Sequence, residues 1–221
     1  GIKLVLKTSK TIPEFEKELK IGWYDFSYMN PFHYTVFHDT SNYHAIIKPK
    51  DKKIKGIIVV RKDSSVKSLK DLSGSELAFP SPSAFAATIL TRAYLKQQKI
   101  FIRPAYVLSH DLVYRAIASK KYAAGGGVIR TMKNTDKNVS NMLRVLWTTK
   151  NFTPHAIAVH ERVPKEVVAR VKKSLEELHT TEEGMKLLHA IKLKGFVNAK
   201  NSDWDDVRSL KINRLTITEP Y

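Results

Sequence analysis

The sequence contains no cysteine. This absence excludes disulfide bonds, thiolate metal ligands and a cysteine nucleophile, although it says little about the cellular compartment. Acidic residues are scarce: 21 Asp and Glu stand against 38 Lys and Arg, which gives a net charge of +17. We therefore expect a negatively charged partner or ligand, such as a nucleic acid, an anionic lipid headgroup or a small oxyanion.

Long hydrophobic runs are also missing. No segment reaches the roughly 18 apolar residues that a membrane span needs, and no charged segment followed by an apolar one opens the chain. Residues 1–6 instead read as a strand that starts without lead-in, and Gly1 is typical of a scar left by tag removal. We therefore interpret the chain as a fragment that lacks a signal peptide and a first strand–helix unit.

The length of 221 residues and the hydrophobic fraction of 43% fit one bilobal unit or a single α/β domain with a real core. Strand-like and helix-like segments alternate, which predicts α/β lobes with largely parallel sheets. The predicted strands are residues 24–29, 44–47, 56–60, 76–79, 103–108, 122–125, 144–148 and 154–160. The predicted helices are residues 12–21, 68–72, 85–97, 110–119, 165–178, 182–191 and 202–210.

The segment PSPSAFAAT at residues 80–88 joins a short apolar strand to an amphipathic helix. The first N–H groups of a helix have no intrahelical partner and carry partial positive charge, so they can bind an anion. We expect Ser83 to cap this helix and Ser81 and Thr88 to remain free to donate hydrogen bonds. Taken alone, the segment is more typical of an ordinary capped helix than of an anion site, because serine is a favoured N-cap residue everywhere.

Three other turns follow predicted strands in the same way, at residues 30–32, 109–111 and 125–131. Ligands of α/β sheets bind at the carboxyl ends of strands, so these turns are candidate binding segments. Each offers donors and few carboxylates. Asp111 is the exception, and we expect it to accept N–H bonds from the first turn of its own helix.

The chain resembles a known family through an ordered set of motifs: YDFSYMNP at residues 24–31, VKSLKDLSGSELAF at 66–79, SAFA at 83–86 and SHD at 109–111. Together they are similar to the phosphate/phosphonate-binding family of ABC-transporter solute-binding proteins. The likeness extends from about residue 11 to residue 210. The ordered set is more specific than any single motif.

This resemblance implies a type II periplasmic-binding fold, in which two α/β lobes are joined by two crossing strands and hold the ligand in a cleft. The crossings are expected near residues 57–60 and 157–160. The first lobe would then contain residues 1–60 and 154–221, and the second lobe residues 61–153.

The resemblance also implies roles for individual residues. Tyr28 and Asn30 would face the ligand from the first lobe, and His110 would donate to it from the second. The oxyanion would be held by the Ser83 hydroxyl and by the backbone N–H groups of the helix start. The complete set of expected ligand-binding residues is Tyr28, Asn30, Ser81, Ser83, Ala84, Phe85, His110 and Arg130.

Two departures from the family pattern bear on the ligand. The family commonly has a hydroxyl-rich Ser-Thr-Ser-Gly turn where this chain has SAFA at residues 83–86, so two side-chain donors are missing. The family often has an Asp, which helps to recognise an amino group, where this chain reads AAGGG at residues 123–127. An aminoalkylphosphonate ligand is therefore in doubt, and Arg130 is a candidate to compensate as a bidentate oxyanion partner.

Each of these residues has a plainer interpretation. Tyr28 in an alternating strand is often a core residue, and His110 and Arg130 are of types that usually lie in solvent. The glycine run has no Gly-Lys-Ser/Thr after it, which argues against a nucleotide-binding loop. The histidines lack the companions and the spacing of common zinc sites, and no Ser/His/Asp set favours catalysis, so we expect no metal, cofactor or catalytic residue.

The sequence thus predicts a non-enzymatic, periplasmic or otherwise extracytoplasmic solute receptor for a phosphonate, phosphate or phosphite, with an ABC permease as partner. Its membrane association would come only through that partner or a removed anchor. A sensor domain of the same fold, signalling to a kinase or cyclase, is an alternative. An enzyme on this fold, with His110 as base, is another. A nucleic-acid-binding module would explain the charge, but its basic residues would be clustered rather than scattered, and no nucleic acid is expected.

Overall fold

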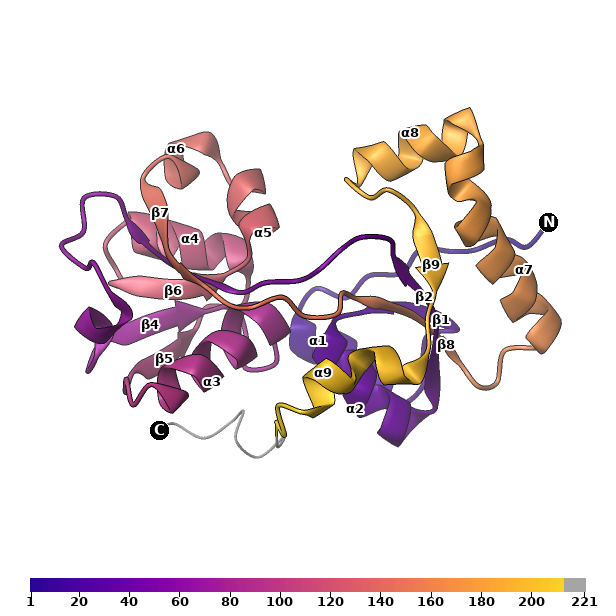
Figure 1. The fold of residues 1–221 in the computed structure, drawn as a ribbon, viewed down its shortest axis with the longest axis horizontal. Coiled ribbons are helices and arrows are strands. Elements are labelled where there is room, and N and C mark those ends of the chain that lie inside the picture. The colour runs from indigo at the N-terminus through magenta and orange to yellow at the C-terminus, as the bar shows by residue number, and fades with distance from the viewer. Residues whose placement is uncertain (213–221) are drawn as a thin grey trace. The chain divides into compact units, whose positions relative to one another are not determined.

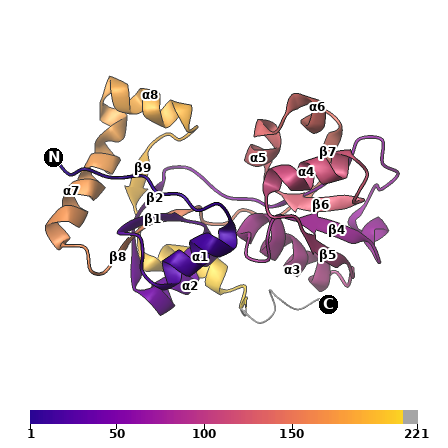
Figure 2. The same ribbon diagram turned by 180° about the vertical axis from the view of Figure 1, so that it is seen from behind.

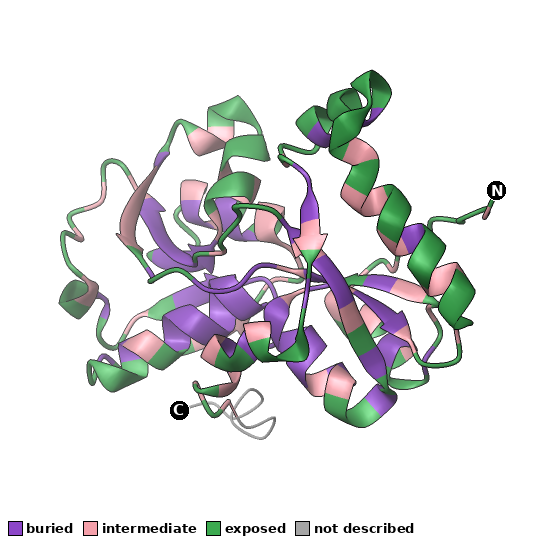
Figure 3. Cartoon of the chain, turned by 45° about the vertical axis from the view of Figure 1, so that its right-hand side comes forward, coloured by how far each residue is buried: buried purple, intermediate pink, exposed green. Residues whose placement is uncertain are grey.

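The computed structural model describes residues 1–212, and these form two compact units. Of the described residues, unit 1 contains residues 1–54 and 152–211, and unit 2 contains residues 55–151 and Ile212. Figure 1 shows that each unit has its own sheet with helices packed on it. Buried residues, coloured purple in Figure 3, lie along the strands of each sheet and on the helices packed against them.

The chain passes between the units just before residue 55 and just before residue 152. Residues 57–60 and 157–160 lie within β3 and β8, and each of these strands pairs with strands of its own unit. Ile54 and Phe152, next to the two passages, form an isolated antiparallel bridge. Residues 213–221, which were expected in the first lobe, lie outside the described residues.

Unit 1 is built on a four-stranded sheet in the order β1-β8-β2-β9. All of its pairings are antiparallel, so the expectation of a largely parallel sheet is wrong for this unit. The elements of unit 1 are α1 (Ile12–Lys20), β1 (Phe26–Met29), α2 (Pro31–Ser41), β2 (Tyr43–Pro49), β8 (Ala156–His160), α7 (Lys165–Glu176), η3 (Glu177–Thr180), α8 (Glu182–Ala190), β9 (Phe196–Asn198), η4 (Asn201–Trp204) and α9 (Asp205–Arg208).

The strand expected at residues 1–6 does not form. A strand is stable when its backbone groups pair with a neighbouring strand, and these residues pair with none among the described strands. Leu4, Val5 and Leu6 are exposed as a result, with Leu6 89% accessible. The apolar pattern of this segment was therefore misleading.

Unit 2 is built on a five-stranded sheet in the order β5-β4-β6-β3-β7. The three strands β5, β4 and β6 run parallel, whereas β3 pairs antiparallel with both β6 and β7. The elements of unit 2 are β3 (Ile57–Arg61), η1 (Leu69–Leu72), β4 (Glu76–Phe79), η2 (Phe85–Ile89), α3 (Leu90–Gln97), β5 (Arg103–Tyr106), α4 (His110–Ala118), β6 (Ala124–Gly127), α5 (Ile129–Asn134), α6 (Lys137–Ser140) and β7 (Leu143–Thr148).

Both faces of the unit 2 sheet are covered, as the view from behind also shows (Figure 2). Ile58 and Val60 of β3 pack in one apolar cluster with residues of α3, while Ile57 and Val59 pack in another with residues of α4. Successive side chains of a strand point to opposite faces. The unbroken apolar run of β3 therefore reflects burial on both faces.

The glycines of β6 are explained by close packing. A Cβ on Gly126 would clash with the backbone carbonyl of Ala87 and with the ring of Phe79, and a Cβ on Gly127 would clash with the Tyr114 hydroxyl. The glycine run is therefore part of a buried strand on which η2 and α4 rest directly. The prediction of a donor-bearing turn from residue 125 is therefore wrong for residues 125–127, which belong to the strand.

We expect Gly126→Ala to lower the free energy of unfolding by about 1–3 kcal/mol, because the added methyl group meets a backbone carbonyl that cannot move without displacing η2. Urea unfolding measures this change. The matched control is Ala123→Ser, an exposed position one residue before the strand, which should shift stability by no more than about 0.5 kcal/mol. An unchanged midpoint for Gly126→Ala would contradict the packing of η2 on β6.

Candidate functional site

Three parallel strands of unit 2 end at the same edge of its sheet. Phe79 of β4 lies opposite Tyr106 of β5, and Ala78 of β4 lies opposite Gly125 of β6. Each strand is followed by a turn and the start of a helix, namely η2, α4 and α5. The carboxyl edge of such a sheet is where ligands of α/β folds bind.

The turn after β4 contains a buried hydroxyl group that makes no hydrogen bond. Ser81 is 3% accessible, and its Oγ has no partner among the described residues. Its carbonyl is fully engaged instead, because it accepts from the Thr88 hydroxyl at 2.7 Å and from the Ala84 N–H at 3.3 Å. A buried polar atom without a partner is costly. Ser81 Oγ is therefore a strong candidate to donate to a ligand.

The helix after this turn does not begin as the sequence indicated. Ala84, not Ser83, occupies the cap position, and the first turn, Phe85–Ile89, is a π-helix. Thr88 is not free to donate, since it bonds Ser81, and the Ala84 N–H is likewise used within the turn. Ser83 is not the cap because the start of this helix is held by the Ser81 carbonyl, which accepts from Ala84 and Thr88, rather than by a capping side chain. Single π-turns are frequent at functional sites.

His110 is the first residue of α4 and lies at the carboxyl end of β5. Its Nδ1 atom is buried and has no hydrogen-bond partner among the described residues. Burial lowers the pKa of His110 to about 4, so the imidazole is neutral near pH 7. A neutral imidazole carries one N–H donor, which suits it to a hydrogen bond with an oxyanion.

The other polar groups at the start of α4 are already engaged. Ser109 caps the helix, its hydroxyl accepting from the Leu112 N–H at 3.2 Å. The sequence predicted that Asp111 would accept N–H bonds from the first turn of its helix. It forms an ion pair with Arg115 instead, at 2.6 Å. Four-residue spacing on a helix favours this pairing. The carboxylate nearest to His110 in the sequence is therefore occupied by a cation.

The turn after β6 is held by the buried hydroxyl of Tyr114 from α4. This hydroxyl donates to the Val128 carbonyl and accepts from the Val128 N–H, both at 3.0 Å, and lies 2.6 Å from the Thr131 hydroxyl. Burial raises the pKa of Tyr114. Arg130, in the first turn of α5, is exposed and forms no ion pair with the described residues. Tyr114 thus fixes the β6–α5 turn to the helix that begins with His110.

In unit 1 the expected ligand residues have different surroundings. Tyr28, in β1, is 48% accessible, and its ring stacks on that of His155 with centroids 4.8 Å apart. Asn30 caps α2, its side-chain oxygen accepting from the His33 N–H at 2.8 Å. Helix α2 was not predicted from the sequence, and its first residues were expected to form a turn, although Asn30-Pro31 is a cap followed by a proline at the first helical position.

The sequence did not indicate His155 as a partner of Tyr28. The two residues are far apart in the chain and meet because β1 and β8 pair with Tyr28 opposite Ile157. No motif or spacing signals such a contact. The structure brings Ser81, His110 and Arg130 to one edge of unit 2, and it brings Tyr28 and His155 together in unit 1.

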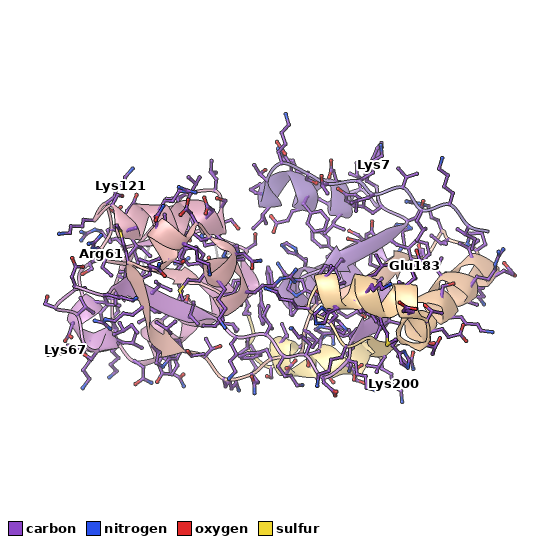
Figure 4. The ribbon with its side chains drawn as sticks, turned by 90° about the horizontal axis from the view of Figure 1, so that it is seen from above. Lys7, Arg61, Lys67, Lys121, Glu183 and Lys200 are labelled. Atoms are coloured by element: carbon purple, nitrogen blue, oxygen red, sulfur yellow. The ribbon has the colours of Figure 1, made fainter. Side chains whose placement is uncertain are left out.

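The described residues, 1–212, contain no group of three His, Asp or Glu side chains arranged to hold a metal ion. None of their helices is long and apolar enough to cross a membrane. The basic residues are scattered: Lys67 and Lys121 project from unit 2 and Lys7 and Lys200 from unit 1 (Figure 4).

Comparison with known proteins identifies the family. The model of the family described as "ABC transporter, phosphonate, periplasmic substrate-binding protein" matches residues 1–204. The chain belongs to this phosphonate-binding family of ABC transporters. Members are solute-binding proteins, which are not enzymes. A search of curated proteins finds no match.

Solved structures show the same fold. A binding-protein component of an ABC phosphonate transporter from Pseudomonas aeruginosa matches with a TM-score of 0.79 and 14% identity over 90% of this chain and 71% of that one. A protein from Xanthomonas citri bound to chloride matches at 0.76, with 14% identity over 90% and 79% of the chains. The protein PhnD1 from Prochlorococcus marinus, in complex with methylphosphonate, matches with a TM-score of 0.75 and 18% identity over 91% of this chain and 82% of that one. The family's type II periplasmic-binding fold, expected from the sequence, is confirmed.

Proposed function

We propose that this chain binds a small phosphorus oxyanion, namely a phosphonate, phosphate or phosphite, and delivers it to an ABC permease on the periplasmic side of a membrane. One observation carries the proposal. Two buried polar atoms without partners, Ser81 Oγ and His110 Nδ1, follow the carboxyl ends of the adjacent parallel strands β4 and β5. The structure of a similar family protein with methylphosphonate supports the same class of ligand.

The available donors are sufficient for useful affinity. Hydrogen bonds to a charged group contribute about 1.5–3 kcal/mol each, and a micromolar complex needs about −8 kcal/mol. Ser81, His110 and Arg130 of unit 2 supply three such bonds. Ordering of the ligand and side chains offsets part of this gain.

The side-chain chemistry favours a ligand without an amino group. An ammonium group is usually recognised by a carboxylate, but residues 123–127 contain none and β6 is fully buried. Asp111 is paired with Arg115. We therefore propose methylphosphonate-like ligands, with inorganic phosphate or phosphite as the smaller members of the class.

Calorimetric titration and thermal-shift measurements test the proposal. Methylphosphonate, phosphate and phosphite should each raise the melting temperature when in large excess, because they bind only the folded state. 2-Aminoethylphosphonate should bind at least about tenfold more weakly than methylphosphonate, since its ammonium group loses solvent without gaining a partner. Chloride at the same ionic strength is the control.

Two outcomes would overturn the proposal. The first is the absence of any stabilisation by the three phosphorus anions. The second is wild-type affinity for methylphosphonate in both Ser81→Ala and His110→Asn, which would place the ligand elsewhere.

A further inference from the structure

The connection between β5 and α4 contains a strained three-residue turn. The Ser109 N–H donates to the Val107 carbonyl at 3.0 Å, and Leu108 between them has φ +71°. A hydrogen bond from residue i+2 to residue i defines a γ-turn, and the form with positive φ at its centre is rare and strained. Leucine bears a Cβ atom, which clashes in this region, whereas glycine adopts it freely.

Leu108 differs from the other residues that have positive φ. Most of these follow the end of a helix, where a left-handed residue is a common way to stop it, and Asp51 lies in a surface turn. The non-glycine residues with positive φ are Asn42, Asp51, Lys99, Leu108, Lys120, Lys192 and Lys211. Leu108 is the apolar member of this set, and it precedes a helix.

Burial of the Leu108 side chain does not compensate for the backbone strain at this residue. The Leu108 side chain is 64% accessible, so its burial contributes little to folding. A backbone outlier that the protein keeps without such compensation is a reason to look for a functional role.

The residues on both sides of Leu108 are firmly held. The Val107 N–H donates to the carbonyl of Phe79 at 2.9 Å, which ties the turn to the last residue of β4. Ser109 caps α4. Leu108 is thus the hinge point that sets the direction in which α4 leaves the strand. The two candidate ligand residues lie close to these held positions in the chain: Ser81 follows Phe79 by two residues, and His110 follows Ser109 directly.

We propose that Leu108 is a positioning residue for the anion site: its γ-turn holds His110 at the edge of β4, close to the Ser81 turn. This inference rests on the proposed function. A Cβ atom restricts the conformations open to the turn, so leucine holds α4 in one direction where glycine would allow several. The strained turn lowers folding stability and in exchange keeps the imidazole in its buried place before the ligand arrives.

The experiment compares Leu108→Gly with Leu108→Ala. Glycine removes the Cβ atom and with it both the strain and the restriction. Alanine keeps the Cβ atom and removes only the exposed apolar side chain. The measurements are the melting temperature, the affinity for methylphosphonate, and the NMR titration of His110 in the ligand-free protein, whose pKa of about 4 reports its burial.

We expect Leu108→Gly to melt at or above the wild-type temperature, while its methylphosphonate affinity falls about tenfold or more, as for the loss of one charge-assisted hydrogen bond. Its His110 pKa should move up toward the ordinary value, because the imidazole is no longer held in a buried position. Leu108→Ala should match the wild type in affinity and in the His110 titration.

Three results would overturn the inference. The first is wild-type affinity together with a wild-type His110 titration in Leu108→Gly, and the second is a melting temperature of Leu108→Gly below that of the wild type. The third is an equal loss of affinity in Leu108→Gly and Leu108→Ala, which would indicate a contact made by the leucine side chain. Should Leu108→Gly fail to fold, Leu108→Asn is the second variant, since it tolerates positive φ and keeps a Cβ atom. It should keep the wild-type affinity and the wild-type His110 titration, and a loss of either would overturn the inference. The His110 titration needs no ligand, so the turn is tested even if the wild type binds none of the anions and the proposed function fails.

Discussion

Acidification from pH 7 to pH 4 is expected to destabilise the wild-type protein by about 3 kcal/mol more than the His110→Asn variant, since one pKa unit corresponds to about 1.36 kcal/mol. The effect comes from the difference between the pKa of His110 in the folded protein, about 4, and its ordinary value of 6.5. Burial is the cause, because the enclosed imidazole resists acquiring a charge.

The sign follows from proton uptake. Above pH 6.5 the imidazole is neutral in both the folded and the unfolded chain, so His110 causes no pH dependence there. Between pH 6.5 and about 4 the unfolded chain binds a proton that the folded protein does not, and stability falls as the pH falls. Below about pH 4 both states are protonated and the loss is complete.

Urea unfolding at pH 7, 5.5 and 4 measures this loss for the wild type and His110→Asn. His179→Asn, which removes an exposed histidine of unit 1, is the matched control and should keep the wild-type pH dependence. Parallel curves for the wild type and His110→Asn would show that His110 is not buried in its neutral form. The placement of its Nδ1 at the candidate site would then be wrong.

The sequence was most informative where local patterns and burial agree. The helical spacing of Ile12, Phe15 and Leu19 predicted α1, and the apolar segment at residues 76–79 predicted β4 within the same bounds. It also predicted strands before each of the three turns that carry Ser81, His110 and Arg130. The edge of unit 2 could be predicted because parallel strands linked by helices place their carboxyl ends together.

The sequence was least informative where contacts between distant residues decide the structure. The antiparallel sheet of unit 1 pairs β1 with β8, which lie on either side of unit 2 in the chain, and no local pattern signals this pairing. The π-turn at Phe85–Ile89 depends on the Ser81 carbonyl and on the close packing of Ala87 against Gly126. A propensity argument sees Ser83 as a cap because it considers only the adjacent residues.

The strained turn at Leu108 was invisible to sequence analysis for a different reason. Leucine is a poor candidate for positive φ, so a local argument continues the strand through it. The hydrogen bond between Val107 and Phe79 overrides this preference by fixing the end of β5 on β4. The residues of the edge could therefore be predicted from the sequence, whereas the buried, unpartnered state of Ser81 Oγ and His110 Nδ1 is seen only in the structure.

Arg130→Gln is expected to weaken methylphosphonate binding by about tenfold, or roughly 1.4 kcal/mol, whereas Arg103→Gln is expected to weaken it by less than about twofold. Both arginines are exposed residues of unit 2. Arg130 follows the carboxyl end of β6, and Arg103 begins β5 at the opposite end of the parallel strands. Both substitutions remove one positive charge, so their difference isolates the position of that charge.

Salt separates the direct contact from the general field of the +17 chain. The Debye length is about 8 Å at physiological salt, so the contribution of a distant surface arginine is screened, while a direct bond to the bound anion is screened much less. Calorimetric titrations at about 50 and 200 mM salt should therefore show the Arg130→Gln defect at both concentrations. A defect that vanishes at the higher salt, or equal defects in the two variants, would mean that Arg130 acts only through net charge. A short DNA duplex is titrated alongside: binding that drops on the order of a thousandfold between these concentrations would show that the positive charge serves a nucleic acid instead.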